Sequence, residues 1–426
     1  MSLTDYAAGA FFSDTLPAGH RTFYEDVLMA TLRTKNIFTQ YCISKTDFAA
    51  KSTGLLVYTE VFDTSPNWNP LTEDQLWLDG AHLDSRQITI GLERHGDVLK
   101  FGDYTELVNY WNSGDFTGLM RGKLGQNLVD YLDILAMNAH LEAPNVQYAG
   151  SATSLYDLAV DDYYDPDLGG LARTHLEEMD IPGVFSVDDT TDQAVVALTS
   201  PRIIRDIRTK NSNKWLEVHR YSNPQMKMRA EAGAWDGVRY LKSNRLRLRN
   251  YGKVTVQTTL DGAAVEGQGS AAMVQGYAVG QANAVRHVQV ASAAGFAVGM
   301  TVTIHSAPVC ADDGAGGHPP VRADGTQEQR RIVSIDVANN RLAFDRPLMK
   351  PHATGSYVTK GIDVTPTIIL GGPSVVLGIG ERPTPTFPPK IDDHMMINRI
   401  GWRAFLKFQM FRPEWTEIIW SAISDD

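Results

Sequence analysis

The chain has 426 residues, of which 43% are hydrophobic and 21% charged, and its formal net charge is −11. That length can bury a substantial core and suggests two to three domains. The acidic balance argues against general binding to phosphate backbones, and two cysteines are too few for a disulfide framework. We therefore expect a protein that is made and used in a reducing cytoplasm.

The sequence predicts neither export nor membrane insertion. The first residues lack the basic and apolar regions of a secretory signal. The longest apolar stretch, residues 367–380, is interrupted by Gly371, Gly372 and Pro373 and is too short to span a bilayer. We expect no contact with a membrane.

Residues 1–50 are interpreted as an N-terminal arm and a helix. The first twenty residues contain several Gly and Ala and predict irregular structure. Thr22 with Glu25 three residues later is a capping box, which predicts the start of a helix.

Residues 51–102 predict a long two-stranded arm. An apolar strand begins at Gly54, and residues 87–92 alternate apolar and polar side chains in the return strand. The connection between them is long and rich in Asn, Pro, Asp and Trp, which is typical of a projecting or functional loop. Two strands are marginally stable alone, so we expect a neighbouring subunit to cover the arm. The candidate intersubunit contacts are Trp68, Leu76, Trp77, Leu78, Ile88 and Ile90.

Residues 103–144 predict one long helix. Asp103 with Glu106 resembles a capping box, and Pro144 ends the periodic run. Its apolar face is predicted from leucines at helical spacing, namely Leu124, Leu128, Leu132 and Leu135. Glycines in the first part predict a break or bend near residues 113–118.

Residues 145–200 predict mixed strands and loops with a turn cluster at 161–167, and residues 261–283 predict a Gly-, Ala- and Gln-rich linker. Helices are expected after Ser200-Pro201 and after Asn223-Pro224, and strands over 238–260. Acidic residues dominate 155–192 and basic residues dominate 201–253. These two blocks could be solvated faces, or could pair within one subunit or across a subunit boundary.

Residues 284–358 predict a small inserted β domain. Four short apolar strands centre on Val288, Val302, Ile335 and Leu342, and turns separate them. Such a pattern is typical of a barrel or a sandwich.

Residues 359–426 return to the main body and end in a dense aromatic segment. It begins with Ile400-Gly401-Trp402, continues through an aromatic strand to Phe408, and closes with Arg412-Pro413-Glu414-Trp415. This ending is similar to the close of the major capsid proteins of N-four-type podophages. An arm, a long helix and a β-rich remainder, in that order, resemble the Hong Kong 97 capsid fold of tailed-phage shells.

The resemblance implies an α+β fold of the Hong Kong 97 type. Its parts would be the N-terminal arm and helix (1–50), the E-loop (51–102), the spine helix (103–144), the first part of the peripheral and axial domains (145–283), the inserted β domain (284–358) and the return to those domains (359–426).

The implied function is that of a major capsid protein, which forms the icosahedral shell around the double-stranded DNA of a tailed phage. Partners would be other copies in hexamers and pentamers, portal and scaffolding proteins, and possibly a decoration protein, with only weak contact to packaged DNA. The protein would reside in the virion capsid after assembly in the bacterial cytoplasm. No Lys lies between Lys51 and Lys100, so the arm lacks the amine with which some related shells cross-link. We expect a non-covalent shell and no catalytic residue, cofactor or metal.

Competing interpretations of the sequence stay open at this point. Arg94-His95-Gly96 matches the tripeptide of histidine phosphatases and suggests a phosphohydrolase using His95. Cys310 with Asp312, Asp313 and His318 could suggest a metal site, although the spacing matches no paired-ligand pattern. An encapsulin-like nanocompartment of the same fold and a tail or adhesin module built on the β domain are further alternatives.

Overall fold

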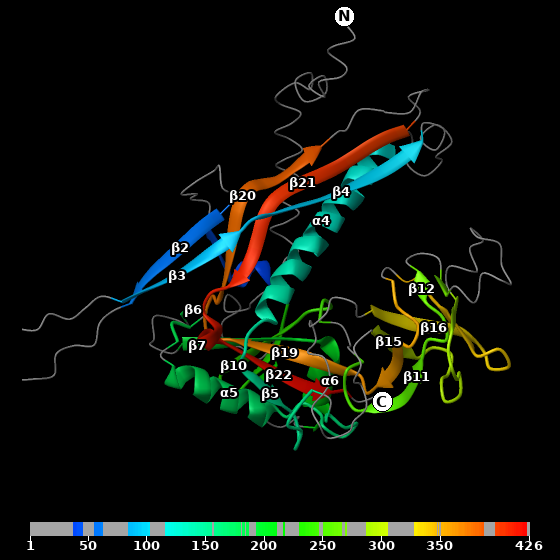
Figure 1. Ribbon diagram of the computed structural model, residues 1–426. Coiled ribbons are helices and arrows are strands. Elements are labelled where there is room, and N and C mark those ends of the chain that lie inside the picture. The colour runs from blue at the N-terminus through cyan, green and yellow to red at the C-terminus, as the bar shows by residue number, and fades with distance from the viewer. Residues whose placement is uncertain are drawn as a thin grey trace, which may run out of the picture. The chain divides into compact units, whose positions relative to one another are not determined.

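The computed structural model (Figure 1) describes residues 37–45, 55–62, 84–102, 116–155, 157–179, 181–183, 185–186, 193–210, 216–217, 230–246, 250–265, 269–270, 287–305, 328–346, 348, 351–386 and 397–423. The chain forms two compact units, the first comprising residues 1–143 and 373–413 and the second 144–372 and 414–426. The expected helices after Thr22 and Pro224 and the loop around Cys310 lie outside the described residues.

A four-stranded sheet forms the centre of the first unit. Its order is β1 (Cys42–Lys45), β20 (Val375–Thr386), β21 (Ile397–Met410) and β4 (Glu93–Gly102). β1 runs parallel to β20, and the other two pairs are antiparallel. The sheet therefore joins segments that are some 300 residues apart in sequence, as the pairing of Glu93 with Leu406 illustrates.

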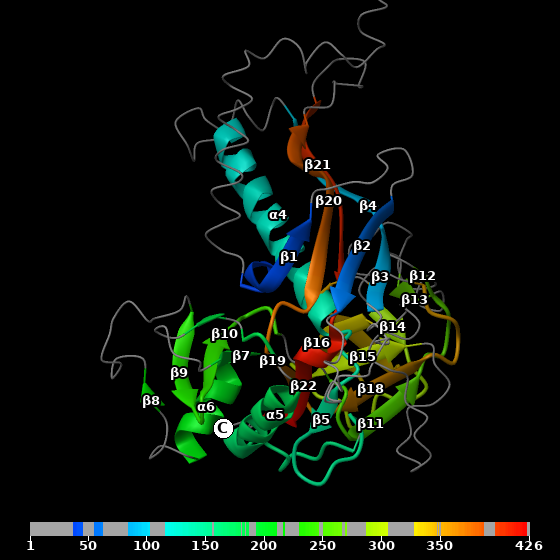
Figure 2. The ribbon, with the colours of Figure 1, turned by 90° about the vertical axis from the view of Figure 1, so that its left-hand side faces the viewer.

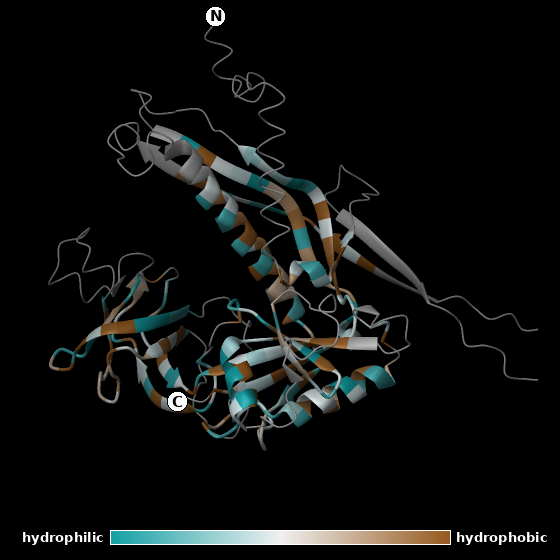
Figure 3. Ribbon diagram, turned by 180° about the vertical axis from the view of Figure 1, so that it is seen from behind, coloured by the Kyte–Doolittle hydropathy of each residue, from teal (hydrophilic) through white to brown (hydrophobic). Residues whose placement is uncertain are grey.

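The helix α4 (Phe116–His140) packs on this sheet through β21, β20 and β4. Leu124, Leu128 and Leu132 are buried as predicted, and Leu135 is half-buried. On β21 the buried side chains alternate with less buried ones, as a half-covered strand requires; they are Ile400, Trp402, Ala404, Leu406 and Phe408. Figure 3 shows the alternation of hydropathy along α4. The predicted helix is confirmed over 116–140, while its expected start at Asp103 lies outside the described residues.

A separate two-stranded ribbon completes the first unit. β2 (Leu55–Phe62) pairs antiparallel with β3 (Asp84–Gly91), from Leu55 opposite Gly91 to Phe62 opposite Asp84. Within the part of the chain that the structure describes, neither strand pairs with a third. The four-stranded sheet lies between α4 and the ribbon in both Figure 1 and Figure 2.

The second unit contains an eight-stranded main sheet. Its order is β5 (Val146–Tyr148), β22 (Thr416–Ala422), β19 (Val364–Leu370), β7 (Gln193–Thr199), β10 (Val238–Lys242), β9 (Glu231–Trp235) and β8 (Leu216–Glu217), and β6 (Phe185–Ser186) pairs with β7. Every residue of β19 and β22 is buried. Strands buried on both faces read as continuous apolar runs, which explains the aromatic and aliphatic end of the chain.

Two helices cover the main sheet. α6 (Pro201–Lys210) confirms the predicted start, because the amide of Ile203 donates to the hydroxyl of Ser200 over 3.5 Å. α5 (Pro166–Glu178) replaces the predicted strands and loops after the turn cluster. Asp165 caps it by accepting from the amide of Asp167, and Pro166 occupies its first position. This Asp-Pro pair was the overlooked signal in the sequence.

The inserted β domain is a closed barrel. Its strands follow the order β11 (Val254–Thr259), β18 (Tyr357–Gly361), β15 (Thr301–His305), β16 (Glu328–Asp336), β17 (Arg341–Phe344) and β14 (His287–Gln289). Leu260 forms a bridge with Val290, and the amide of Ala291 donates to the carbonyl of Thr259 over 2.8 Å, which joins the first strand to the last. The four strands predicted near Val288, Val302, Ile335 and Leu342 are present, but β11 and most of β18 lie outside the expected range 284–358. A short pair, β12 (Ala264–Val265) and β13 (Gly269–Ser270), adjoins the barrel.

Within the described residues, no helix is both long enough and apolar enough to cross a membrane.

Candidate functional site

The root of the ribbon is anchored inside its own subunit. Ile90 is fully buried against Val376 of β20 and Phe411, and Ile43 and Ile88 pack partly buried against the same cluster. Ile90 was expected to contact a neighbouring subunit, but a side chain already buried in its own fold offers no surface to a partner. We correct its role to that of an anchor. Ile88, which is only half-buried, retains exposed area.

The other expected contacts lie outside the described residues. Trp68, Leu76, Trp77 and Leu78 belong to the connection between β2 and β3, over residues 63–83. Their role in subunit contact therefore stays a prediction. The described part of the ribbon ends where Phe62 of β2 pairs with Asp84 of β3.

The ribbon itself is the candidate assembly site. Each of its strands has eight residues and one edge that pairs with no other described strand. Unpaired backbone amides and carbonyls along a strand edge can hydrogen-bond to another chain. A two-stranded ribbon gains stability by leaning on a further surface. Within the described residues, both outer edges of the ribbon are therefore open to a further strand.

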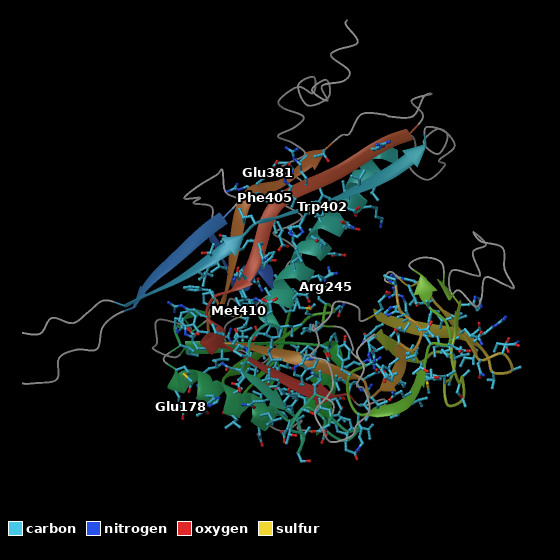
Figure 4. All side chains as sticks on the ribbon, viewed as in Figure 1. Glu178, Arg245, Glu381, Trp402, Phe405 and Met410 are labelled. Atoms are coloured by element: carbon cyan, nitrogen blue, oxygen red, sulfur yellow. The ribbon has the colours of Figure 1, made fainter. Side chains whose placement is uncertain are left out.

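Ion pairs link the strands that carry the ribbon. Lys407 of β21 donates to Glu93 of β4 over 2.7 Å, and this hydrogen bond lowers the pKa of the Glu93 carboxyl. Arg403 donates to Glu381 of β20 over 3.0 Å; Figure 4 labels Glu381 with Phe405 of β21. All four side chains are partly exposed, and such pairs contribute at most about 1 kcal/mol each. They favour one strand alignment more than they stabilise the fold.

A cluster of rings fixes β4 and β21 on α4. Trp402 is almost fully buried and donates its indole N–H to Asn127 over 3.3 Å. The ring of Tyr131 lies 5.6 Å from that of Trp402 and 5.5 Å from that of His95. Aromatic pairs at these separations contribute about 0.5–1.5 kcal/mol beyond their buried area. These contacts hold β4, which directly follows β3 of the ribbon, on α4.

This cluster also tests the phosphohydrolase interpretation. His95 lies within a hydrogen bond of Tyr131, with Nδ1 2.9 Å from the hydroxyl, while Nε2 lies 3.9 Å from Glu93. Arg94 and His95 are consecutive residues of an extended strand, so their side chains point to opposite faces of the sheet. A phosphate clamp needs both groups on one side. The geometry does not support catalysis by this tripeptide.

The segment before β1 is held on α4 by a buried carboxylate. Asp133 is 1% exposed, and its Oδ1 accepts from the amides of Ile37 over 3.0 Å and Phe38 over 2.9 Å. Nearby, His140 is fully buried, and burial lowers the pKa of its imidazole to about 4. Burial also raises the pKa of the Cys42 thiol, whose sulfur lies 3.8 Å from His140. Cys42 is half-buried, and a thiol that stays protonated is unreactive.

Metal ligation finds no support in the described part of the chain, where no group of three or more His, Cys, Asp or Glu side chains is placed to hold an ion. Cys310 and His318 fall in residues 306–327, outside the described ranges.

Three residues of the ribbon root had not been identified as functional candidates from the sequence. Ile43, Val376 and Phe411 come from three separate segments and hold β3 only because the sheet brings them together. No local motif marks them, since each reads as an ordinary apolar residue of a strand or turn.

Comparisons with known proteins identify the fold. No family model and no curated sequence matches the chain. The capsid of Ralstonia phage GP4 matches with a TM-score of 0.53 and 12% identity, over 92% of this chain and 92% of that chain. The acid-stable capsid of Helicobacter pylori bacteriophage KHP30 matches with a TM-score of 0.48, 11% identity, and 92% and 91% coverage. The capsid of cyanophage Pam1 matches with a TM-score of 0.47, 12% identity, and 93% coverage of each chain.

The match to the GP4 capsid shows that the chain has the fold of a phage capsid subunit, and the predicted α+β fold of the Hong Kong 97 type is confirmed. The match extends over nearly the whole length of both chains, so no large part of either one is left without a counterpart.

Proposed function

We propose that this chain is the major capsid protein of a tailed bacteriophage, and that many copies assemble into the icosahedral shell enclosing the double-stranded DNA genome. The observation that carries the proposal is the capsid fold, which spans 92% of the chain. The segment from Ile400 to Trp415 is similar to the close of the major capsid proteins of N-four-type podophages, and this similarity supports membership of that subfamily.

The ribbon supports assembly independently of the comparison. Its strands leave one edge each without a described partner strand, and the three apolar residues at its root fix where it leaves the subunit. Large permanent interfaces are dominated by apolar area. The side chains that would supply it to a neighbouring copy follow β2 in the sequence; they are Trp68, Leu76, Trp77 and Leu78.

The proposed partners follow from that role. Copies would form hexamers and pentamers, with a portal protein and a separate scaffolding protein during assembly in the bacterial cytoplasm. The barrel would face a neighbouring copy or a decoration protein. The net charge of −11 favours weak contact with the packaged DNA, because like charges repel along the inner surface.

We further propose that the role is structural and not enzymatic. His95 lies within a hydrogen bond of Tyr131, and Arg94 points to the opposite face of β4. The proposed shell is held by packing and hydrogen bonds alone, because the segment between Lys51 and Lys100 contains no amine for a cross-link.

Electron microscopy of the protein expressed in bacteria tests the proposal. We expect closed particles of uniform diameter, or rings of five and six copies when no scaffold is present. A protein that stays monomeric at high concentration, with and without co-expressed scaffolding protein, would overturn it. Particles that enclose a cargo enzyme in place of nucleic acid would favour a nanocompartment.

A further inference from the structure

Gln147 and Glu417 connect the two ends of the second unit. Gln147 lies on β5, the first described strand of that unit, and Glu417 lies on β22, the last. The two strands pair in parallel, with Ile419 opposite Gln147, and they lie side by side in Figure 1 and Figure 2. The amide Nε2 of Gln147 donates a hydrogen bond to Oε1 of Glu417, and this bond joins residues 270 positions apart in sequence.

The polar atoms of this pair are not fully matched when Glu417 is ionised. The Glu417 side chain is 4% exposed, and a carboxylate can only accept hydrogen bonds. Oε1 of Gln147 also only accepts, and within the described part of the chain this buried oxygen has no hydrogen-bond partner. A buried acceptor that no donor reaches is destabilising.

A proton on Glu417 removes the mismatch. The protonated carboxyl gains one O–H donor, which can donate to Oε1 of Gln147 while Nε2 of Gln147 still donates to Oε1 of Glu417. Each side chain then donates once and accepts once, and the pair carries no buried charge. The surroundings favour this state, because burial raises the pKa of the Glu417 carboxyl.

The residues around Glu417 include one other titratable side chain that affects it. The direct neighbour on β19 is Ile369, and the next residue on the same face of β22 is Ile419. From α5, which packs on β22, Nδ1 of His175 lies 3.8 Å from Oε1 of Glu417. Charge on His175 and the bond from Gln147 both act to lower the pKa of Glu417, but burial outweighs them.

The strand β5 is suited to respond to a change in this pair. It has three residues and pairs with no described strand other than β22. Beside it, the amide of Ile418 donates to the carbonyl of Asn145 and the amide of Ala149 donates to the carbonyl of Trp420, each over 2.9 Å. Short edge segments open locally more easily than the centre of a sheet, so one side-chain bond is a large part of what holds β5.

We propose that Glu417 and Gln147 form a proton-dependent clasp, which fastens β5 to β22 more firmly when the Glu417 carboxyl is protonated. The folded state binds this proton more tightly than the unfolded state, so the stabilisation is complete below the ordinary pKa of a glutamate, 4.5. It is lost as the pH rises through the folded pKa of Glu417. The clasp is a pH-sensitive element of the single subunit and does not depend on the proposed function.

Hydrogen exchange at the amides of Ile418 and Ala149 measures the clasp. Glu417→Gln keeps a donor at this position at every pH, so ionisation cannot open the clasp in that variant. We expect both proteins to be similarly protected at a pH of about 4.5, and the wild type to be about fivefold less protected than the variant at a pH of about 8. Protection factors are corrected for intrinsic exchange, and the acid effect of His140 cancels because both proteins carry it. A ratio that stays constant over this range refutes the clasp.

A second variant tests whether the proton is shared with Gln147. Gln147→Leu removes the acceptor and leaves Glu417 buried. A clasp that is closed in acid predicts that this variant loses about fivefold protection relative to the wild type at a pH of about 4.5. Equal or higher protection would show that Oε1 of Gln147 has no donor even in acid, and would overturn the proposal although Glu417 still titrates.

His175→Gln is the control for the neighbouring imidazole. Because charge on His175 lowers the pKa of Glu417, the pH response should persist in this variant and move to higher pH. A response that disappears would assign the titration to His175 and refute the clasp. In every variant, the amide of Ile332 in the barrel, which donates to the carbonyl of Met300 over 2.8 Å, should keep its protection, so that local opening is distinguished from global unfolding.

Discussion

The side chain of Asn250 is bonded to both backbone groups of Gly361. Its Oδ1 accepts from the amide of Gly361 over 2.6 Å, and its Nδ2 donates to the carbonyl of Gly361 over 2.9 Å. Nδ2 also reaches the carbonyl of Thr301 over 2.9 Å. Because residue 250 precedes the first barrel strand and residue 361 ends β18, this one buried side chain joins the two chain segments that enter and leave the barrel.

Replacing Asn250 by Ala should destabilise the second unit strongly. The substitution leaves the buried amide and carbonyl of Gly361 and the half-buried carbonyl of Thr301 without this partner, and each buried group costs about 1–3 kcal/mol. We expect a loss of at least about 3 kcal/mol in the free energy of unfolding, measured by urea denaturation. Thr255→Ala, which removes one exposed hydrogen bond to the carbonyl of Lys360, is the matched control and should cost under about 1 kcal/mol. Equal losses for the two variants would contradict the proposed role of Asn250.

Truncations at the root of the ribbon and in the connection between β2 and β3 should have different effects. Ile90→Ala removes a fully buried side chain from its cluster with Val376 and Phe411, and such a change costs about 2–5 kcal/mol. Trp68→Ala with Trp77→Ala should leave the melting temperature of the isolated subunit nearly unchanged but impair shell formation.

Differential scanning calorimetry and electron microscopy measure the two effects separately. Normal particles from the double tryptophan variant would count against the prediction that the connection between β2 and β3 binds a neighbouring subunit. A large loss of subunit stability in that variant would show that the tryptophans pack within their own chain.

His140 should make the first unit sensitive to acid. Burial lowers the pKa of its imidazole to about 4, whereas an unfolded histidine titrates near 6.5. Between these values the unfolded chain binds more protons than the folded one, so stability falls as the pH falls from about 6.5 to 4. The contribution is about 3 kcal/mol.

His140→Gln should remove the part of the decline in stability that comes from protonation of His140. Urea denaturation at a series of pH values should then show a smaller decline for the variant than for the wild type over that window. Identical pH profiles for the two proteins would mean that His140 is not buried as a neutral group.

Removal of His95 should affect stability and not catalysis. His95→Ala breaks the hydrogen bond with the Tyr131 hydroxyl, at a cost of about 1 kcal/mol. We expect neither the wild type nor the variant to hydrolyse p-nitrophenyl phosphate above the buffer rate. A wild-type activity that the variant loses would revive the phosphohydrolase interpretation.

Glu417 should give a pH effect of the opposite sign to that of His140. This carboxyl lies buried on β22 beside Gln147 and His175, and burial raises its pKa. The folded state therefore favours its proton, and the stabilisation present at low pH is lost as the pH rises through the folded pKa. Glu417→Gln should be more stable than the wild type at neutral pH, and the difference should shrink below pH of about 4.5. A thermal melt at each pH measures it.

Local sequence patterns identified the helices and strands whose caps and apolar faces are formed by residues close together in the sequence. The start of α6 followed from Ser200 and Pro201, and the buried face of α4 followed from its leucines at 124, 128 and 132. α5 was missed although Asp165-Pro166 marked it, because the surrounding acidic residues were interpreted as a turn cluster.

By itself, the sequence determined the two-stranded arm, the long helix, the small β domain and the order in which they follow, since hydrophobic periodicity and capping depend on neighbours along the chain. Only the tertiary structure decided that Ile90 anchors the ribbon, that the barrel closes through Leu260 and Val290, and that Asn250 joins its two ends. Those facts depend on side chains that meet across large separations in sequence, and no local pattern encodes which distant partner each one finds.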